Sequence, residues 1–83
     1  MPNRVQVIKE ARREWEEDKV ALCFQWCQYV YEDGTSEHGY RFIWRKDERL
    51  LPARGQARIP SIQILEQLVA QAKREGWANL AGE

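Results

Sequence analysis

The stretch from Val20 to Lys46 constrains the fold more than any other part of this chain. An Asp-Gly pair, Asp33 and Gly34, separates two runs that are rich in β-branched and aromatic residues. Such a pair between two strand-like runs is typical of a β-hairpin. The sequence therefore predicts two antiparallel strands within residues 20–46.

Two registers are open to this hairpin. A two-residue loop at Asp33 and Gly34 places Trp26 opposite Arg41. A type I turn at Glu32 and Asp33, with Gly34 as a left-handed bulge residue, shifts the pairing by one residue. This second register gathers six large side chains on one face, in the pairs Leu22 with Trp44, Phe24 with Phe42, and Trp26 with Tyr40. Because such cross-strand pairs stabilise a sheet, we expect the second register.

The other face of the hairpin is mixed in character. It carries Cys23, Gln25, Cys27, Tyr29 and Tyr31 beside Arg41, Ile43 and Arg45. Another element or another subunit can cover such a face, or it can stay open to a ligand. The two cysteines lie ~13 Å apart on an extended strand, which is too far for a disulfide. We expect both to be reduced thiols.

The segment from Ser61 to Trp77 predicts an amphipathic helix. Ser61 is a suitable N-cap, and Gly76 is a suitable left-handed residue after the helix. Apolar residues recur at helical spacing, at Ile62, Leu65, Leu68, Val69 and Ala72. We expect this helix to pack on the aromatic face of the hairpin.

Residues 3–18 are predicted as a first helix. Val5, Ile8, Ala11 and Trp15 recur at intervals of three or four residues. Two observations oppose a helix: acidic residues 16–18 would lie at its C-terminal end, where the dipole disfavours them, and Val5 with Val7 could instead begin a strand. We expect the helix.

The predicted fold is a single small α+β domain, residues 1–83, in the order α-β-β-(β)-α. The optional third strand is a short edge strand within LLPARGQARI, because Pro52 and Gly55 oppose a central one. This order is similar in outline to that of double-stranded-RNA-binding domains. The lysine-rich entry to their last helix, which contacts RNA, has no counterpart in PSIQILEQLVAQAK. The resemblance therefore transfers no functional residue.

Composition is that of a globular protein, with 43% hydrophobic and 31% charged residues. A domain of this size buries only ~60–65% of its unfolded surface, and the four tryptophans help to build an efficient core. No apolar run approaches the ~18 residues of a membrane span. Charges also interrupt the N-terminal residues, so we expect no signal peptide and a cytoplasmic location.

Catalytic chemistry is not expected. His38 is the single histidine, and the preferred register turns it to the face opposite Cys27. A Cys-His pair is therefore not expected, and two cysteines with one histidine make a poor metal site. The chain has no glycine-rich phosphate loop of recognised form. The sequence predicts a protein that is not an enzyme and that has no cofactor, no metal and no small-molecule substrate.

Positive charge concentrates in residues 41–58, with a net charge of +4, whereas residues 1–40 carry −3 and residues 59–83 carry −1. Five of the six cations in this segment are arginine, which suits bidentate contact with carboxylate or phosphate. Two tyrosines share the predicted sheet face and add surfaces for stacking. The candidate binding residues are Arg41, Arg45, Arg49, Arg54, Arg58, Tyr29 and Tyr31.

Two functional hypotheses follow. The first is a non-catalytic protein-binding or adaptor module that self-associates as a homodimer, because oppositely charged segments steer partners together. Pairing of the same charges within one chain is an equal alternative. The second hypothesis is DNA or RNA binding through residues 41–58. A net charge of zero and a pI near 6.6 are unusual for a nucleic-acid-binding domain. No membrane partner is expected.

Overall fold

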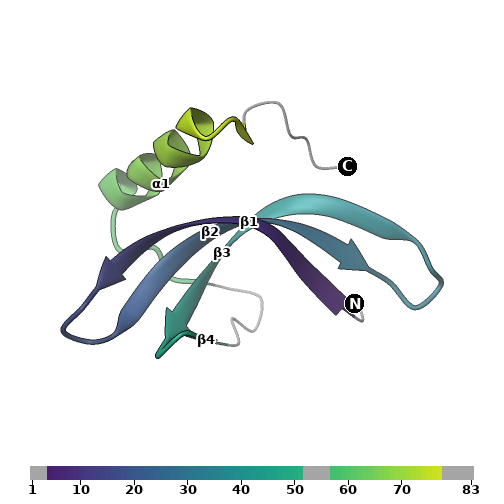
Figure 1. Cartoon of the computed structure of the whole chain (residues 1–83), viewed down its shortest axis with the longest axis horizontal. Helices are drawn as coiled ribbons and strands as arrows, with labels where there is room; N and C mark the ends of the chain where they lie inside the picture. The colour runs from purple at the N-terminus through teal and green to yellow at the C-terminus, as the bar shows by residue number, and fades with distance from the viewer. Residues whose placement is uncertain (1–3, 52–56, 78–83) are drawn as a thin grey trace.

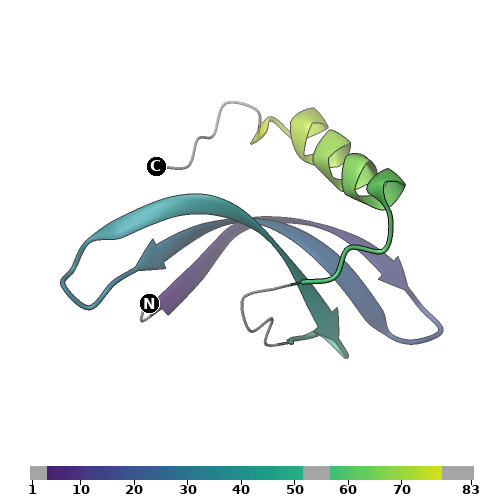
Figure 2. The ribbon, with the colours of Figure 1, turned by 180° about the vertical axis from the view of Figure 1, so that it is seen from behind.

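A computed structural model describes residues 4–51 and 57–77. One antiparallel sheet contains four strands in the order β1-β2-β3-β4, and one helix follows it. The elements are β1 Arg4–Trp15, β2 Val20–Val30, β3 Ser36–Lys46, β4 Arg49–Leu50 and α1 Ile62–Arg74. The sheet curls into an arch, and α1 lies above one arm of it on the convex side (Figures 1 and 2).

The predicted N-terminal helix is wrong, and so is the order α-β-β-(β)-α. Residues 4–15 form a strand that pairs with β2 along its length, from Arg4 opposite Val30 to Trp15 opposite Val20. The likeness in outline to double-stranded-RNA-binding domains does not hold either, because it depended on a first helix. Tertiary pairing outweighs the helical spacing here, since β2 needs a neighbour on each side to bond its backbone.

A β-bulge in β1 explains why the sequence pattern resembled a helix. The pairing with β2 shifts between Val7 and Lys9, so Ile8 is one residue more than the partner strand supplies. The shift reverses the alternation along the strand: Val5 and Val7 face the concave side, and Ala11 faces the helix. Apolar residues on two faces, separated by a bulge, reproduced the spacing of one helical stripe.

The predicted register of the central hairpin is confirmed. Tyr31 N–H donates to the carbonyl oxygen of Thr35 at 2.9 Å, and Gly34 adopts a φ of +87°. Glycine reaches this region without the clash that a Cβ introduces. The pairs Leu22 with Trp44, Phe24 with Phe42, and Trp26 with Tyr40 all form. The rings of Phe24 and Phe42 stack at a centroid distance of 4.7 Å.

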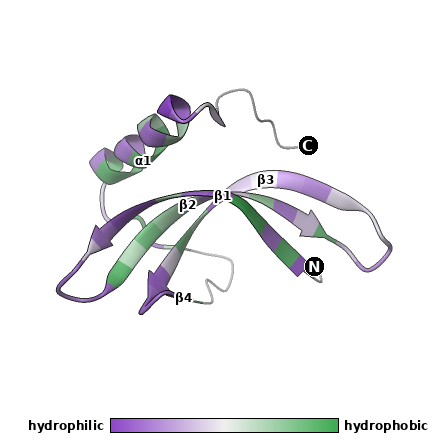
Figure 3. Cartoon of the chain, viewed as in Figure 1, coloured by the Kyte–Doolittle hydropathy of each residue, from purple (hydrophilic) through white to green (hydrophobic). Residues whose placement is uncertain are grey.

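The predicted C-terminal helix is confirmed as α1. The side chain of Ser61 accepts a hydrogen bond from the Ile64 N–H at 3.2 Å, and Gly76 has a φ of +90°. In Figure 3 hydrophobic and hydrophilic residues alternate along α1, as an amphipathic helix requires. Its buried face joins one core with the convex side of the sheet, made of Ala11, Leu22, Trp26, Leu68, Ala72 and Trp77.

Among the described residues, the predicted edge strand within LLPARGQARI is represented by Leu50, the second residue of β4. Asp47 and Glu48 connect β4 to β3 in a tight turn, with φ values of +50° and +66°. Pro52 and Gly55, on which the prediction was argued, lie outside the described residues. Within the described ranges, no helix has the length and apolar character that crossing a membrane requires.

Candidate interaction surface

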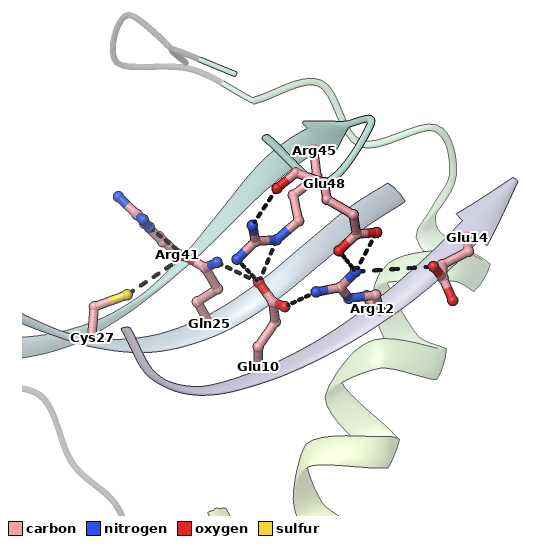
Figure 4. Close-up of polar contacts among 8 residues, drawn as sticks. All are labelled: Glu10, Arg12, Glu14, Gln25, Cys27, Arg41, Arg45 and Glu48. Carbon is pink, nitrogen blue, oxygen red and sulfur yellow. Dashed lines mark hydrogen bonds and ion pairs between the residues drawn. The ribbon is translucent and has the colours of Figure 1, made fainter. Parts of the chain in front are cut away.

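A polar cluster fills the concave side of the arch, on the arm that α1 covers from outside (Figure 4). Gln25, at its centre, is completely buried. Its Nε2 donates to Oε1 of Glu10 at 2.6 Å, and its Oε1 accepts from Nε of Arg41 at 2.7 Å. The described residues contain no buried side-chain nitrogen or oxygen without a hydrogen bond. The cluster is therefore fully satisfied.

Glu10 is the anionic centre of this cluster. It accepts from Arg12 at 2.5 Å and from Arg45 at 3.0 Å, in addition to Gln25. Burial alone would raise the pKa of this carboxyl, but the bonds from Gln25, Arg12 and Arg45 outweigh it and lower the pKa to about 2. The same carboxylate, together with Glu48, raises the pKa of Arg12. These charges stabilise one another inside the fold.

Both cysteines lie in the floor of the concave side and are free and buried. Burial raises the pKa of Cys23 to about 11, and burial also raises the pKa of Cys27. Each thiol is therefore protonated at neutral pH and poorly nucleophilic. His38 lies on the convex face, where its ring stacks on Trp26 at a centroid distance of 5.4 Å. The structure does not bring the histidine to either thiol.

Metal binding has no support in the described residues, which contain no group of three or more His, Cys, Asp or Glu side chains placed to hold an ion. A hollow of about 430 Å³ opens where the β1–β2 turn meets the β3–β4 turn. Acidic residues line much of it, at Glu14, Glu16, Asp47 and Glu48. It holds no further feature that indicates a ligand.

The structure divides the predicted binding residues among several places. Arg45 lies inside the cluster, bonded to Glu10 and to the carbonyl oxygen of Glu48. Arg41 lies at the border of the cluster, and its terminal nitrogens point away from it (Figure 4). Arg49 is exposed and pairs with Lys46, which puts both on the face opposite Arg45.

The remaining predicted residues are also separated. Arg58 is exposed near the start of α1, and its carbonyl oxygen accepts the indole N–H of Trp44 at 2.7 Å. Arg54 lies outside the described residues. The five arginines therefore do not form one described surface.

Tyr29 and Tyr31 lie at the other arm of the arch, beside β3. A Cβ placed on Gly39 would lie 3.7 Å from Cε2 of Tyr29, so this ring covers the glycine. The hydroxyl of Tyr31 donates to a carboxylate oxygen of Glu37 at 3.3 Å. Together with Arg41, these residues border one segment of β3.

That segment of β3 has one edge without a strand neighbour among the described residues. The backbone hydrogen bonds between β2 and β3 join odd-numbered residues. The bonds at the two ends of the hairpin, from Tyr31 N–H to Thr35 O and from Asp47 N–H to Lys19 O, establish this pattern. Consecutive residues of a strand direct their backbone groups to opposite sides. The even-numbered residues of β3 therefore direct theirs away from β2.

Only a small part of this edge is covered by the described chain. β4 pairs with Arg45 and Lys46, and Leu51 N–H donates to the carbonyl oxygen of Trp44 at 2.8 Å. From Ser36 to Ile43, β3 has no strand neighbour on this side among the described residues. We call residues 36–43 the β3 edge segment.

An apolar hollow of about 180 Å³ lies beside the β3 edge segment, between α1 and the sheet. Its lining residues are Phe24, Tyr40, Val69, Ala72, Lys73 and Trp77. Tyr40 closes one side of it by donating its hydroxyl hydrogen to the carbonyl oxygen of Trp77 at 3.1 Å. The exposed edge thus borders apolar surface.

Sequence reasoning missed two parts of this arrangement. Glu10, Arg12 and Gln25 were not proposed to interact, because their contact depends on the pairing of β1 with β2. The β3 edge segment was missed because its lack of a strand neighbour in the described chain depends on where β4 ends. A usable signal was present in Pro52, which cannot donate a backbone hydrogen bond to a continuing ladder.

Comparison with known proteins gives no relative. No protein-family model, no curated protein and no solved structure matches the chain.

Proposed function

We propose that this chain is a non-catalytic protein-binding module that self-associates as a homodimer through the β3 edge segment. The observation that carries the proposal is the exposed edge itself: residues 36–43 lie on a regular strand with no strand neighbour on one side in the described chain. A strand edge of this kind is a template for another strand. A second copy supplies a strand that matches it.

The second edge of the sheet, along β1, is less suited to pairing. It contains the bulge at Ile8, and charged residues occupy most of positions 9–14. Bulges and charges are the devices by which natural proteins keep edge strands apart. The β3 edge segment carries only Glu37 and Arg41 as full charges, and its convex side is aromatic or small.

Sedimentation velocity across a concentration series tests the proposal. We expect the mass to rise from 9.9 kDa toward twice that value as concentration rises. The variant His38→Pro removes one backbone donor that points away from β2, so it leaves the β2–β3 ladder bonded and weakens association. Val5→Pro makes the same change on the exposed edge of β1 and is the matched control. A chain that stays monomeric at every concentration contradicts the proposal.

The alternative is nucleic-acid binding through residues 41–58. The observation that favours it is the pairing of Lys46 with Arg49, which places two exposed cations side by side. Elution from heparin or an oligonucleotide column separates the two functions. Phosphate binding requires an affinity that falls steeply as salt rises, with roughly one counterion released per contact. Self-association without retention on either column supports the protein-binding module.

The proposal includes a cytoplasmic location and a function without a cofactor. Two free, buried thiols with raised pKa values suit a reducing compartment. The partner is a second copy of this chain.

A further inference from the structure

We infer that the two copies pair antiparallel, β3 against β3, about a two-fold axis at Gly39, in the register that places Glu37 opposite Arg41 of the second copy. The inference rests on the proposed self-association and adds the register and the ion pair that select it. It follows from three features: the direction of the backbone groups, the order of side chains along the segment, and the space at Gly39.

The backbone groups fit this register. Even-numbered residues of β3 direct their N–H and C=O groups outward, so they must be the hydrogen-bonded pairs of any added antiparallel strand. With the axis at Gly39, Ser36 lies opposite Phe42 of the second copy, and His38 lies opposite Tyr40. Each of these pairs joins two even-numbered residues. Glu37 and Arg41 then form pairs of the closer, non-hydrogen-bonded type.

The side chains select this register over its neighbours. The segment SEHGYRF is self-complementary about its central glycine, because Glu37 and Arg41 lie two residues to either side of it. Moving the axis to residue 38 or 40 places Glu37 opposite Gly39 or Ile43, without a counter-ion. Moving it to residue 37 or 41 opposes like charges. Opposite charges at facing positions stabilise a sheet, and like charges destabilise it.

Contacts within the same chain hold the Arg41 side chain in place. Its Nε donates to Oε1 of Gln25 at 2.7 Å, and Gln25 in turn donates to Glu10 in the buried cluster. The terminal nitrogens point away from the cluster (Figure 4). Glu37 is exposed on the same concave side and accepts only from the hydroxyl of Tyr31 among the described residues. Both charges are therefore presented at the edge.

Gly39 allows the strands to approach at the axis. Facing residues of the non-hydrogen-bonded type lie ~4.5 Å apart at their Cα atoms. A two-fold axis perpendicular to the sheet keeps both helices on the convex side and both clusters on the concave side. The dimer is then one continuous sheet in which the two β3 strands are central.

Cysteine cross-linking tests the register. In the background Cys27→Ser, which removes the thiol that faces position 39 within one chain, Gly39→Cys places two thiols across the axis at a distance that a disulfide spans. Among the described residues, a Cβ at this position meets only the Tyr29 ring, at 3.7 Å, so the variant is expected to fold. We expect a disulfide-linked dimer under mild oxidation, at a concentration where the wild type is dimeric.

Ser36→Cys in the same background is the matched control. In the inferred register Ser36 lies six residues along the strand from its own counterpart, ~20 Å away, and forms no cross-link. A cross-link at Ser36 but not at Gly39 overturns the register.

Charge reversal tests the ion pair. Glu37→Arg opposes two arginines twice per dimer, and we expect the dissociation constant to rise about tenfold or more. The double variant Glu37→Arg with Arg41→Glu restores the pair in reverse and should recover most of the affinity. Glu32→Arg, in the exposed turn, changes the net charge equally and should leave the dissociation constant within about twofold.

The outcomes distinguish this inference from the function on which it rests. A wild type that dimerises while the Gly39 variant does not cross-link overturns the inference and leaves the proposed function standing. A wild type that is monomeric at every concentration overturns the proposed function. If Arg41→Glu does not fold, the cross-linking result and the single Glu37→Arg variant decide.

Discussion

Arg45 on β3 reaches across the intervening strand β2 to Glu10 on β1, with its Nε and Nη2 each 3.0 Å from the same carboxylate oxygen. An arginine and a glutamate side chain together are long enough to meet across two strand spacings, which amount to ~9.6 Å. The contact therefore ties the outer strand of the sheet to β3 on the concave side. Its residues lie 35 positions apart in the chain, so it also closes a long loop.

Replacing Glu10 with Gln should lower the free energy of unfolding by about 1–3 kcal/mol at pH 7. The change leaves Arg45 partly buried without a carboxylate partner, whereas Arg12 keeps Glu48 and the more distant Glu14. Hydrogen bonds to charged groups contribute ~1.5–3 kcal/mol. Urea denaturation measures the difference. Glu17→Gln, in the exposed β1–β2 turn, is the control and should change the free energy by less than ~0.5 kcal/mol.

Stability should fall as pH falls from about 4.5 to about 2, and this part of the pH dependence should be absent in the Glu10→Gln variant. The pKa of Glu10 is lowered from 4.5 to about 2 in the folded chain, so the unfolded chain binds the proton first on acidification. Asp33, whose pKa is lowered by hydrogen bonds from Thr35, stays in both proteins and keeps a smaller dependence. Parallel acid titrations followed by circular dichroism test this. Identical profiles for the two proteins would show that Glu10 titrates normally.

Trp26→Ala should cost ~3–5 kcal/mol, which is enough to unfold a domain of this size. Trp26 is only 6% exposed and packs against Tyr40 at a centroid distance of 4.7 Å. Thermal unfolding followed by circular dichroism measures the change. Ile62→Ala is the contrast, since Ile62 is 74% exposed and its loss should be close to neutral. An unchanged melting temperature for Trp26→Ala contradicts the position of the core.

Lys19→Gly should stabilise the chain by about 0.5–1.5 kcal/mol. Lys19 has a φ of +54° in the β1–β2 turn, a region in which any Cβ is strained and glycine is not. The control is Lys46→Gly, at an exposed strand position with ordinary φ, which should destabilise by ~0.5–1 kcal/mol. Chemical denaturation of both variants gives the comparison, and two changes of the same sign would contradict the role of the turn.

Neither native cysteine should react with iodoacetamide in the folded protein at pH 8. Both thiols are completely buried, and burial raises their pKa values, so thiolate is scarce and the reagent has no access. Intact-mass measurement should show no adduct in the native state and two in urea. An added thiol, Glu32→Cys, should react quickly and marks the rate of an accessible site. Rapid labelling of the native chain would show that the concave side opens.

The hairpin and the final helix were predictable because local chemistry determines each of them. Gly34 is placed where the turn needs a positive φ, and only one register buries the aromatic pairs. Ser61 and Gly76 mark the two ends of α1 in the sequence as they do in the structure. In both elements the spacing of apolar residues and the turn or capping residues predict the same structure.

The first strand was not predictable from its own residues, because the bulge at Ile8 hides the alternation that identifies a strand. The acidic residues 16–18, which argued against a helix end, form the turn into β2. The buried cluster depends on this strand, so its members could not be recognised either. Arg45 was assigned to an interaction surface by its charge, whereas the carboxylate that holds it lies on an element that the prediction had made a helix.

The curvature of the arch follows from a count of residues. Between Arg4 and Trp15, β1 contains one residue more than the part of β2 with which it pairs. The extra residue bends the bulged strand, and the sheet curves with it. The identity of the side chain at position 8 is secondary to this, since Ile8 is nearly half exposed. Substitution there keeps the geometry, whereas insertion or deletion of a single residue changes it. The number of residues in β1 therefore constrains the curvature of the sheet more than the identity of the residue at position 8 does.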